Sequence, residues 1–157
     1  MDKSNKNGED LNLTKLEIML KSPLVRSERE LIEILRLLDR IELNCFSDRS
    51  SNGENIRVKL CSLKSEDGRQ WMAVFTSLDA FKTAAATGQF GNITPKDDPE
   101  CIGVTNFFEQ ICRETLKSDK FSGIVVNPNS DSCAVESKYI SKYLSDKKLS
   151  DNSRHVK

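Results

Sequence analysis

Apolar residues recur at intervals of three and four in several parts of the chain, the spacing that places them on one face of an α-helix. The clearest case begins at Ser27, where Glu30 completes a capping box and an apolar stripe runs from Leu31 to Leu38. The same spacing predicts helices over 78–87, 107–116 and 133–144. Over 13–20 it predicts either a short helix or a segment that packs on the domain.

Two caps follow from the residues in front of these helices. Thr76 and Ser77 offer side-chain oxygens to the helix that begins at Leu78, and Asp79 stands where a capping-box partner of Thr76 would be. Asn106 and Glu109 have the same spacing before the next helix. Both patterns predict a capping box.

Four other stretches have the patterns of strands. Apolar and polar residues alternate over 41–46 and over 56–63, whereas Trp71–Phe75 and Gly123–Val126 are short apolar runs. Asp67–Gly68 is a hairpin-turn signal that makes the second and third strands antiparallel neighbours. A helix precedes Gly123, so this strand can join the sheet beside Trp71–Phe75 by a crossover. The pattern predicts one α/β (α+β) domain, with a mixed, mainly antiparallel sheet of about four or five strands flanked by helices.

The polar ends of the chain set the expected domain limits. Residues 1–12 are expected to be a disordered N-terminal tail, residues 13–145 the domain, and residues 146–157 a flexible basic tail. The apolar arm after residue 12 can pack within its own chain, or dock a second copy or another protein. Residues 88–100, with two prolines, are expected to be a long loop that carries any specificity of this protein.

Charge and hydropathy exclude several classes of partner. The chain of 157 residues has 24 basic and 24 acidic side chains, so no overall field attracts nucleic acid or an anionic membrane. No apolar run has the ~20 residues of a membrane span. We therefore expect a cytoplasmic protein that binds no membrane; nucleic-acid binding through the basic C-terminal tail is the less favoured alternative.

The five cysteines do not form a recognisable chemical motif. They are widely spaced, without a C-x-x-C pair, and the single histidine, His155, lies at the end of the chain. We therefore expect no metal, no cofactor and no catalytic residues. Cys133, at the start of a predicted helix, is the best candidate for an activated thiol, although an ordinary buried cysteine is the commoner case.

Two motifs together resemble one known family. They are VFTS at 74–77, followed by a short helix, and GIVVNP at 123–128. This order and spacing resembles the SseB-like family, named for an enhanced-serine-sensitivity protein and defined by its N-terminal domain, over about Ser27–Leu144. The resemblance implies a bacterial cytoplasmic α/β domain and implies no catalytic residues.

The candidate binding residues are Trp71, Thr76, Ser77, Asn127 and Pro128. Trp71 is either core or an exposed anchor for a partner, and the other four stand at strand ends, where turns and caps also account for them. The first functional hypothesis is a non-enzymatic protein-interaction or adaptor module, with a homodimer through the N-terminal arm as one form. The alternative is a small-molecule-binding or small enzyme domain with a pocket near Thr76 and Asn127.

Overall fold

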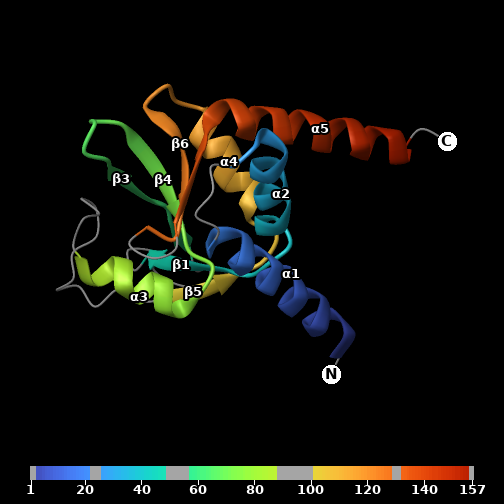
Figure 1. Cartoon of the computed structure of the whole chain (residues 1–157), viewed down its shortest axis with the longest axis horizontal. Coiled ribbons are helices and arrows are strands. Elements are labelled where there is room, and N and C mark those ends of the chain that lie inside the picture. Colours follow the sequence, from blue (N-terminus) through green and yellow to red (C-terminus); the bar gives the residue numbers. More distant parts are fainter. Residues whose placement is uncertain (1–2, 22–25, 49–56, 88–100, 129–131, 156–157) are drawn as a thin grey trace.

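The computed structural model describes residues 3–21, 26–48, 57–87, 101–128 and 132–155, with side chains over 11–21, 26–45, 60–86, 102–128 and 132–148. Helices lie on both sides of the strands (Figure 1). The helices are α1 (Lys3–Lys21), α2 (Glu28–Leu38), α3 (Leu78–Thr87), α4 (Phe108–Leu116) and α5 (Ser137–His155). The strands are β1 (Leu43–Asp48), β2 (Arg57–Lys59), β3 (Cys61–Lys64), β4 (Gln70–Val74), β5 (Cys101–Val104), β6 (Phe121–Val126) and β7 (Cys133–Glu136). The predicted loop over 88–100 lies outside the described residues.

The strands form two sheets. The larger is mixed, in the order β3-β4-β6-β7, and the smaller is antiparallel, in the order β2-β1-β5. Strands β4 and β6 are parallel, with Met72 opposite Ile124, while β3 and β7 run antiparallel to their neighbours. The predicted crossover and the predicted antiparallel hairpin are both confirmed, as is the α/β class with helices flanking a mixed sheet.

The alternating stretch over 56–63 is not one strand. It divides at Leu60, so that β2 pairs with β1 in the smaller sheet and β3 pairs with β4 in the larger sheet. The prediction of one continuous strand was wrong because alternation reports which face each side chain takes and not which sheet the backbone joins. The turn after β3 is as expected: Gly68 has a φ of 88°, a conformation open to glycine at no steric cost, and its N–H donates to Ser65 O at 2.9 Å.

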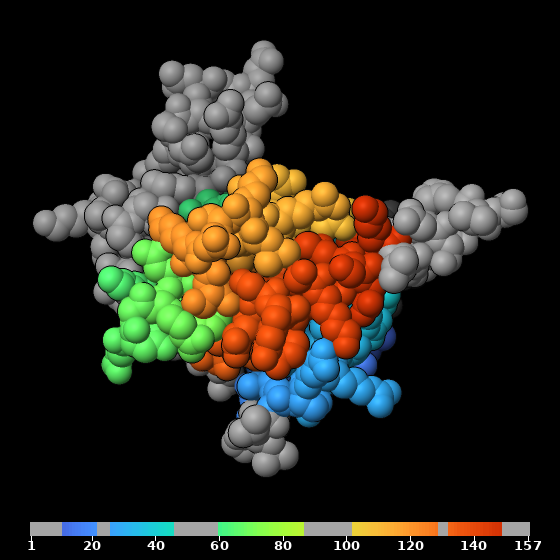
Figure 2. All heavy atoms as spheres, turned by 90° about the horizontal axis from the view of Figure 1, so that it is seen from above, coloured from blue at the N-terminus to red at the C-terminus, as the bar shows by residue number. Residues whose placement is uncertain are grey.

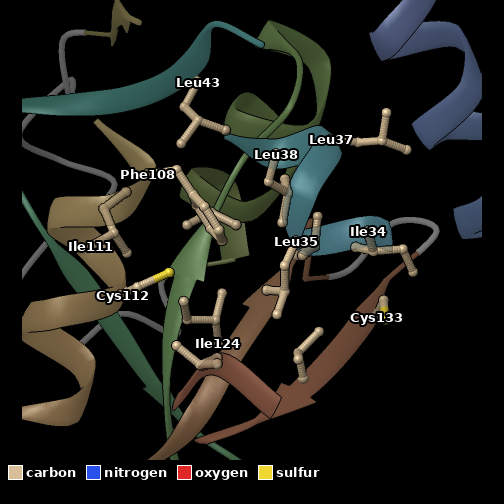
Figure 3. Packing of buried hydrophobic residues seen from close by; sticks show 14 of the residues in the cluster. Ile34, Leu35, Leu37, Leu38, Leu43, Phe108, Ile111, Cys112, Ile124 and Cys133 are labelled. Carbon is tan, nitrogen blue, oxygen red and sulfur yellow. The ribbon is translucent and has the colours of Figure 1, made fainter. Parts of the chain in front are cut away.

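One face of the larger sheet packs against α2, α4 and α5. Figure 3 shows Leu38 of α2 beside Phe108 of α4, with Leu35 directed toward Ile124 of β6. Leu37 points away from this group toward α1. The main core is therefore the space between the sheet and these helices, and the stripe predicted over Leu31–Leu38 supplies much of it.

Helix α5 lies between α2 and α4 on the outer side of this core (Figure 2). A cluster of polar contacts joins it to both helices. Asp39, which caps the C-terminus of α2, accepts hydrogen bonds from the Tyr143 hydroxyl at 2.6 Å and from Lys147 Nζ at 2.5 Å, and Lys147 also pairs with Glu109 of α4 at 3.2 Å. Burial and the bond to Asp39 raise the pKa of Tyr143. These contacts tie the three helices together at one point.

The opposite face of the larger sheet has a smaller core with α3. Phe75 meets Phe81 of α3 edge to face, with ring centroids 5.7 Å apart, and Ala73 and Ala84 belong to the same cluster. Strand β4 is thus buried on both faces, as its continuous apolar run predicts.

The N-terminal arm folds back on its own chain. The side chains of Leu16 and Leu20 are buried in the main core, and Lys15 pairs with Glu33 of α2 at 3.0 Å. Arg26 donates from Nη2 to the carbonyl oxygens of Met19 and Leu20, which are among the last of α1. The helical choice over 13–20 is therefore confirmed, and α1 begins at Lys3, within the segment for which the sequence predicted a disordered tail.

The last predicted helix begins later than expected. Residues 133–136 form strand β7, with Cys133 and Val135 facing the core, and α5 begins at Ser137. The alternation of buried and exposed residues over 133–136 is too short to distinguish from helical spacing. These residues form a strand because they pair with the edge of β6. The helix then continues to His155, where a flexible tail had been expected after residue 145.

One capping box is present and one is absent. Ser27 and Glu30 bond each other's backbone as predicted. The helix after Asn106 begins one residue later, with Phe107 at the N-cap and no side-chain cap bond. Asn106 instead has a φ of 57°, so it serves as a left-handed turn residue.

Gly123 of β6 is the position where we expect an added methyl group to be least tolerated. A Cβ atom there would overlap the carbonyl oxygen of Val135 and lie 2.9 Å from Cα of Glu136, both in the backbone of β7. Because paired strands cannot separate without losing hydrogen bonds, we expect Gly123→Ala to lower the free energy of unfolding by about 1–3 kcal/mol, as measured by urea denaturation.

Gly103→Ala is the matched control. Its Cβ would meet the carboxylate of Glu42, the far end of an exposed side chain that can move aside. We expect a change within about 0.5 kcal/mol. Equal losses for the two variants would contradict the close approach of β7 to β6.

Candidate functional site

The candidate site lies where the two parallel strands end. Strand β4 ends at Val74 and strand β6 at Val126, at the same edge of the larger sheet. The N–H of Asn127 donates to Val74 O at 2.8 Å, and the N–H of Asn44 in β1 donates to Phe75 O at 2.9 Å. These bonds continue the backbone pairing beyond both strand ends and attach the smaller sheet there.

Asn127 and Thr76 are joined by two side-chain hydrogen bonds. Asn127 Oδ1 accepts from the backbone N–H of Thr76 at 2.9 Å, and Asn127 Nδ2 donates to Thr76 Oγ1 at 2.8 Å. Both residues are buried, with exposed fractions of 6% and 3%. Asn127 has a φ of 51°, in the left-handed region that asparagine tolerates better than most residues. The sequence placed the two at strand ends, and the structure brings them together.

Ser77 caps the helix that follows. Its hydroxyl oxygen accepts from the backbone N–H of Ala80 at 3.1 Å, which satisfies one of the unpaired donors in the first turn of α3. The predicted capping box of Thr76 with Asp79 was wrong in this respect, because the Thr76 hydroxyl accepts from Asn127. The two adjacent residues, predicted as equivalent caps, thus have different roles.

A pocket of about 230 Å³ opens beside Thr76 and Asn127. The C-terminal part of α1 forms one wall, and the strand ends and the start of α3 form the other. The lining residues are Glu17, Leu20, Lys21, Thr76, Ser77, Ala80 and Asn127. The carboxyl ends of parallel strands are where α/β sheets most often bind ligands.

The charged residues of the pocket were not singled out from the sequence. Glu17 and Lys21 are exposed, and neither forms an ion pair with another residue that the structure describes. Their spacing of four places them on one side of α1, which was the only available signal. Nothing in the sequence states that α1 lies across the ends of β4 and β6.

Trp71 lies apart from the pocket, near the start of β4 and about 16 Å from Thr76 at the rise of an extended strand. Its side chain is buried, its Nε1–H donates to Ser65 Oγ at 3.2 Å, and the Arg69 guanidinium lies 4.9 Å from its ring centroid. The exposed-anchor interpretation of Trp71 was therefore wrong. Pro128 is buried next to Asn127 and does not line the pocket.

Cys61, Cys112 and Cys133 are buried and form no disulfide, and none of the three is activated. Cys133 lies in β7 and not at a helix N-terminus; burial raises its pKa, although the charge of Arg26 acts in the opposite direction. Burial also raises the pKa of Cys61 to about 12 and that of Cys112 still further. At neutral pH these thiols are protonated, which makes them weak nucleophiles.

The described part of the chain lacks two features. No three His, Cys, Asp or Glu side chains there are grouped so that they could hold a metal ion. None of the described helices is both long and apolar enough to cross a membrane.

The fold and the site together define a class: a single α/β domain with helices on both faces of a mixed sheet and a small polar pocket at the ends of its two parallel strands. Residues 27–142 match the family model of the SseB protein N-terminal domain, so the chain belongs to this family. Helix α1 lies outside the matched residues. No curated protein and no solved structure matched the chain.

Asn127→Ala tests the link between the strand ends. The substitution leaves the buried N–H of Thr76 without an acceptor. It also places alanine at a positive φ, a conformation that asparagine tolerates better. We expect the free energy of unfolding to fall by about 2–4 kcal/mol, as measured by urea denaturation. Asn127→Gly removes the same bonds without the backbone strain and should cost about 1 kcal/mol less. A loss below about 0.5 kcal/mol for Asn127→Ala would contradict the link.

Thiol labelling tests the state of the cysteines. We expect Cys61, Cys112 and Cys133 to resist iodoacetamide at pH 8 in the native protein and to react fully in denaturant, because burial both shields them and raises their pKa. Peptide mass spectrometry reports each site separately. Rapid native labelling of Cys133 would show an accessible thiolate and reopen a nucleophilic role.

Proposed function

We propose that this member of the SseB family is a non-enzymatic protein-interaction module of a bacterial cytoplasm. One observation carries the proposal: α1 exposes two large apolar side chains, Leu11 at 72% and Ile18 at 67%, although its opposite face is anchored in the core. Exposed apolar side chains grouped on one surface are typical of sites where proteins meet.

The two side chains lie on the same side of α1. They are seven residues apart, which is two helical turns, and the exposed Thr14 lies between them. We call Leu11, Thr14 and Ile18 the α1 stripe. The N-terminal part of α1 extends beyond the sheets and the other helices (Figure 1), so a partner can approach the stripe freely.

The proposed partner is a different protein and not a second copy. Two stripes in contact would bury only two large apolar side chains from each copy, whereas stable interfaces bury about 1,200–2,000 Å² in total. A larger partner that also covers the charged residues beside the stripe meets this requirement. A homodimer through the N-terminal arm is therefore the alternative that the experiment below distinguishes from a different protein.

The non-enzymatic and cytoplasmic parts of the proposal have separate support. The protonated state of the buried thiols argues against a cysteine nucleophile. Free cysteines such as Cys61, Cys112 and Cys133 are typical of a reducing compartment, and the family resemblance implies the same setting.

A second candidate function is the binding of a small molecule. The pocket beside Thr76 and Asn127 favours this function, because the sequence predicts a ligand pocket near these two residues and both of them line the cavity. Neither function excludes the other, since the α1 stripe and the pocket involve different sides of α1.

Affinity capture from bacterial extract tests the interaction module. We expect the tagged full chain to retain one protein partner in constant ratio. The double variant Leu11→Ser with Ile18→Ser should retain at least tenfold less of this partner, because each buried Leu or Ile supplies about 1.5–3 kcal/mol. Quantitative mass spectrometry of the retained proteins measures the ratio.

Leu78→Ser is the matched control, an exposed apolar residue on α3 at 46% that lies outside the stripe. It should retain the partner, and all variants should keep their melting temperature. Equal capture by the stripe variant would overturn the proposal. A dimer of the purified chain in light scattering that the stripe variant abolishes would replace the heterologous partner with a second copy.

A further inference from the structure

The α1 wall of the pocket carries one negative and one positive side chain. Glu17 and Lys21 are one helical turn apart, the spacing at which such a pair stabilises a helix by pairing. They line the same pocket, yet no ion pair within 4.0 Å joins them, and neither pairs elsewhere among the described residues. Both charges are therefore available to a molecule in the pocket.

The opposite wall offers hydroxyl donors. Thr76 Oγ1 accepts from Asn127, and Ser77 Oγ accepts from the Ala80 N–H, so each oxygen is occupied as an acceptor. No described residue accepts the hydrogen of either hydroxyl. Thr76 is 97% buried, and a buried hydroxyl of this kind is stabilised by an acceptor in the space that it lines.

We propose that this pocket binds a small zwitterion that has one ammonium and one carboxylate group. The proposal rests on the second candidate function and does not depend on the interaction module. The ligand carboxylate accepts hydrogen bonds from Lys21 and from the hydroxyls of Thr76 and Ser77, and the ligand ammonium faces the carboxylate of Glu17. Charge-assisted hydrogen bonds of this kind are about twice as strong as neutral ones.

The size of the pocket limits the ligand. A volume of 230 Å³ corresponds to about eight water molecules, at the ~30 Å³ that each occupies in the liquid. Only Leu20 and Ala80 offer apolar contact. The ligand is therefore small, with a short aliphatic part between its two charges, and not a nucleotide or a peptide.

The charged wall lies outside the part of the chain that matches the family model. The residues Thr76, Ser77, Ala80 and Asn127 lie within the matched range, whereas Glu17 and Lys21 lie before it. The matched residues thus provide the hydroxyl wall, and helix α1, which precedes them, supplies both charges. Ligand choice in this protein follows from α1.

NMR titration of the full chain tests the proposal with a graded set of probes. The zwitterions are glycine, β-alanine and 4-aminobutyrate, and the single-charge controls are acetate and ethylamine. We expect at least one zwitterion to shift the amide signals of Thr76, Ser77 and Ala80 in a saturable way, and to bind at least tenfold more tightly than either control.

Two exposed substitutions remove the charges without touching the core. We expect Glu17→Gln and Lys21→Gln each to weaken binding about tenfold, the change that corresponds to 1.4 kcal/mol. Thr76→Val should weaken it as well, and Lys82→Gln, exposed on α3 outside the pocket, should leave it unchanged.

The outcomes separate the two proposals. Saturable binding that Glu17→Gln and Lys21→Gln weaken, and that the stripe variant retains, supports the zwitterion site whatever the capture experiment finds. Absence of binding by all three zwitterions, equal binding of acetate, or unchanged binding in both charge variants would overturn it. Loss of protein capture in the stripe variant alone bears only on the interaction module.

Discussion

The bonds of Asn127 fix the geometry on which the candidate site depends. Its backbone N–H and its side-chain oxygen bind the end of β4 at Val74 O and Thr76 N, so that the two parallel strands end in register. A short polar side chain at a positive φ can do this, since asparagine tolerates the left-handed region and carries both a donor and an acceptor. Ser77, the next residue after Thr76, then caps α3. The strand ends and the start of α3 are thereby held together as one wall of the pocket.

Helix α1 carries both proposed surfaces because its faces differ. One face places Leu16 and Leu20 in the main core, so the helix is held in position. The side toward the strand ends presents Glu17 and Lys21 to the pocket, and the outer side exposes Leu11 and Ile18. A ligand in the pocket would contact the same helix as a partner on the stripe. The SseB family match begins after this helix, so the proposed partner surface lies before the matched residues, and the pocket combines α1 with them.

The cysteines and Trp71 show how burial decides chemistry. A thiol at a helix N-terminus is activated, but Cys133 lies in a strand whose side chains face the core, and its pKa rises. Trp71 is held by Ser65 and Arg69 at the opposite end of β4 from the pocket. In both cases the residue type suggested a role that the surrounding residues remove.

The sequence by itself determined the elements whose cause is local. These elements depend on neighbouring residues, so the sequence pattern predicts them directly. They are the apolar face of α2, the turn at Gly68, the buried run of β4 and the order of the motifs around Thr76 and Asn127. Only the tertiary structure decided the division of 56–63 between two sheets, the strand at Cys133 and the bond between Thr76 and Asn127. These depend on partners distant in the chain. The charged wall of the pocket has the same origin, because helical spacing places Glu17 and Lys21 together but only packing of Leu16 and Leu20 sets them against the strand ends.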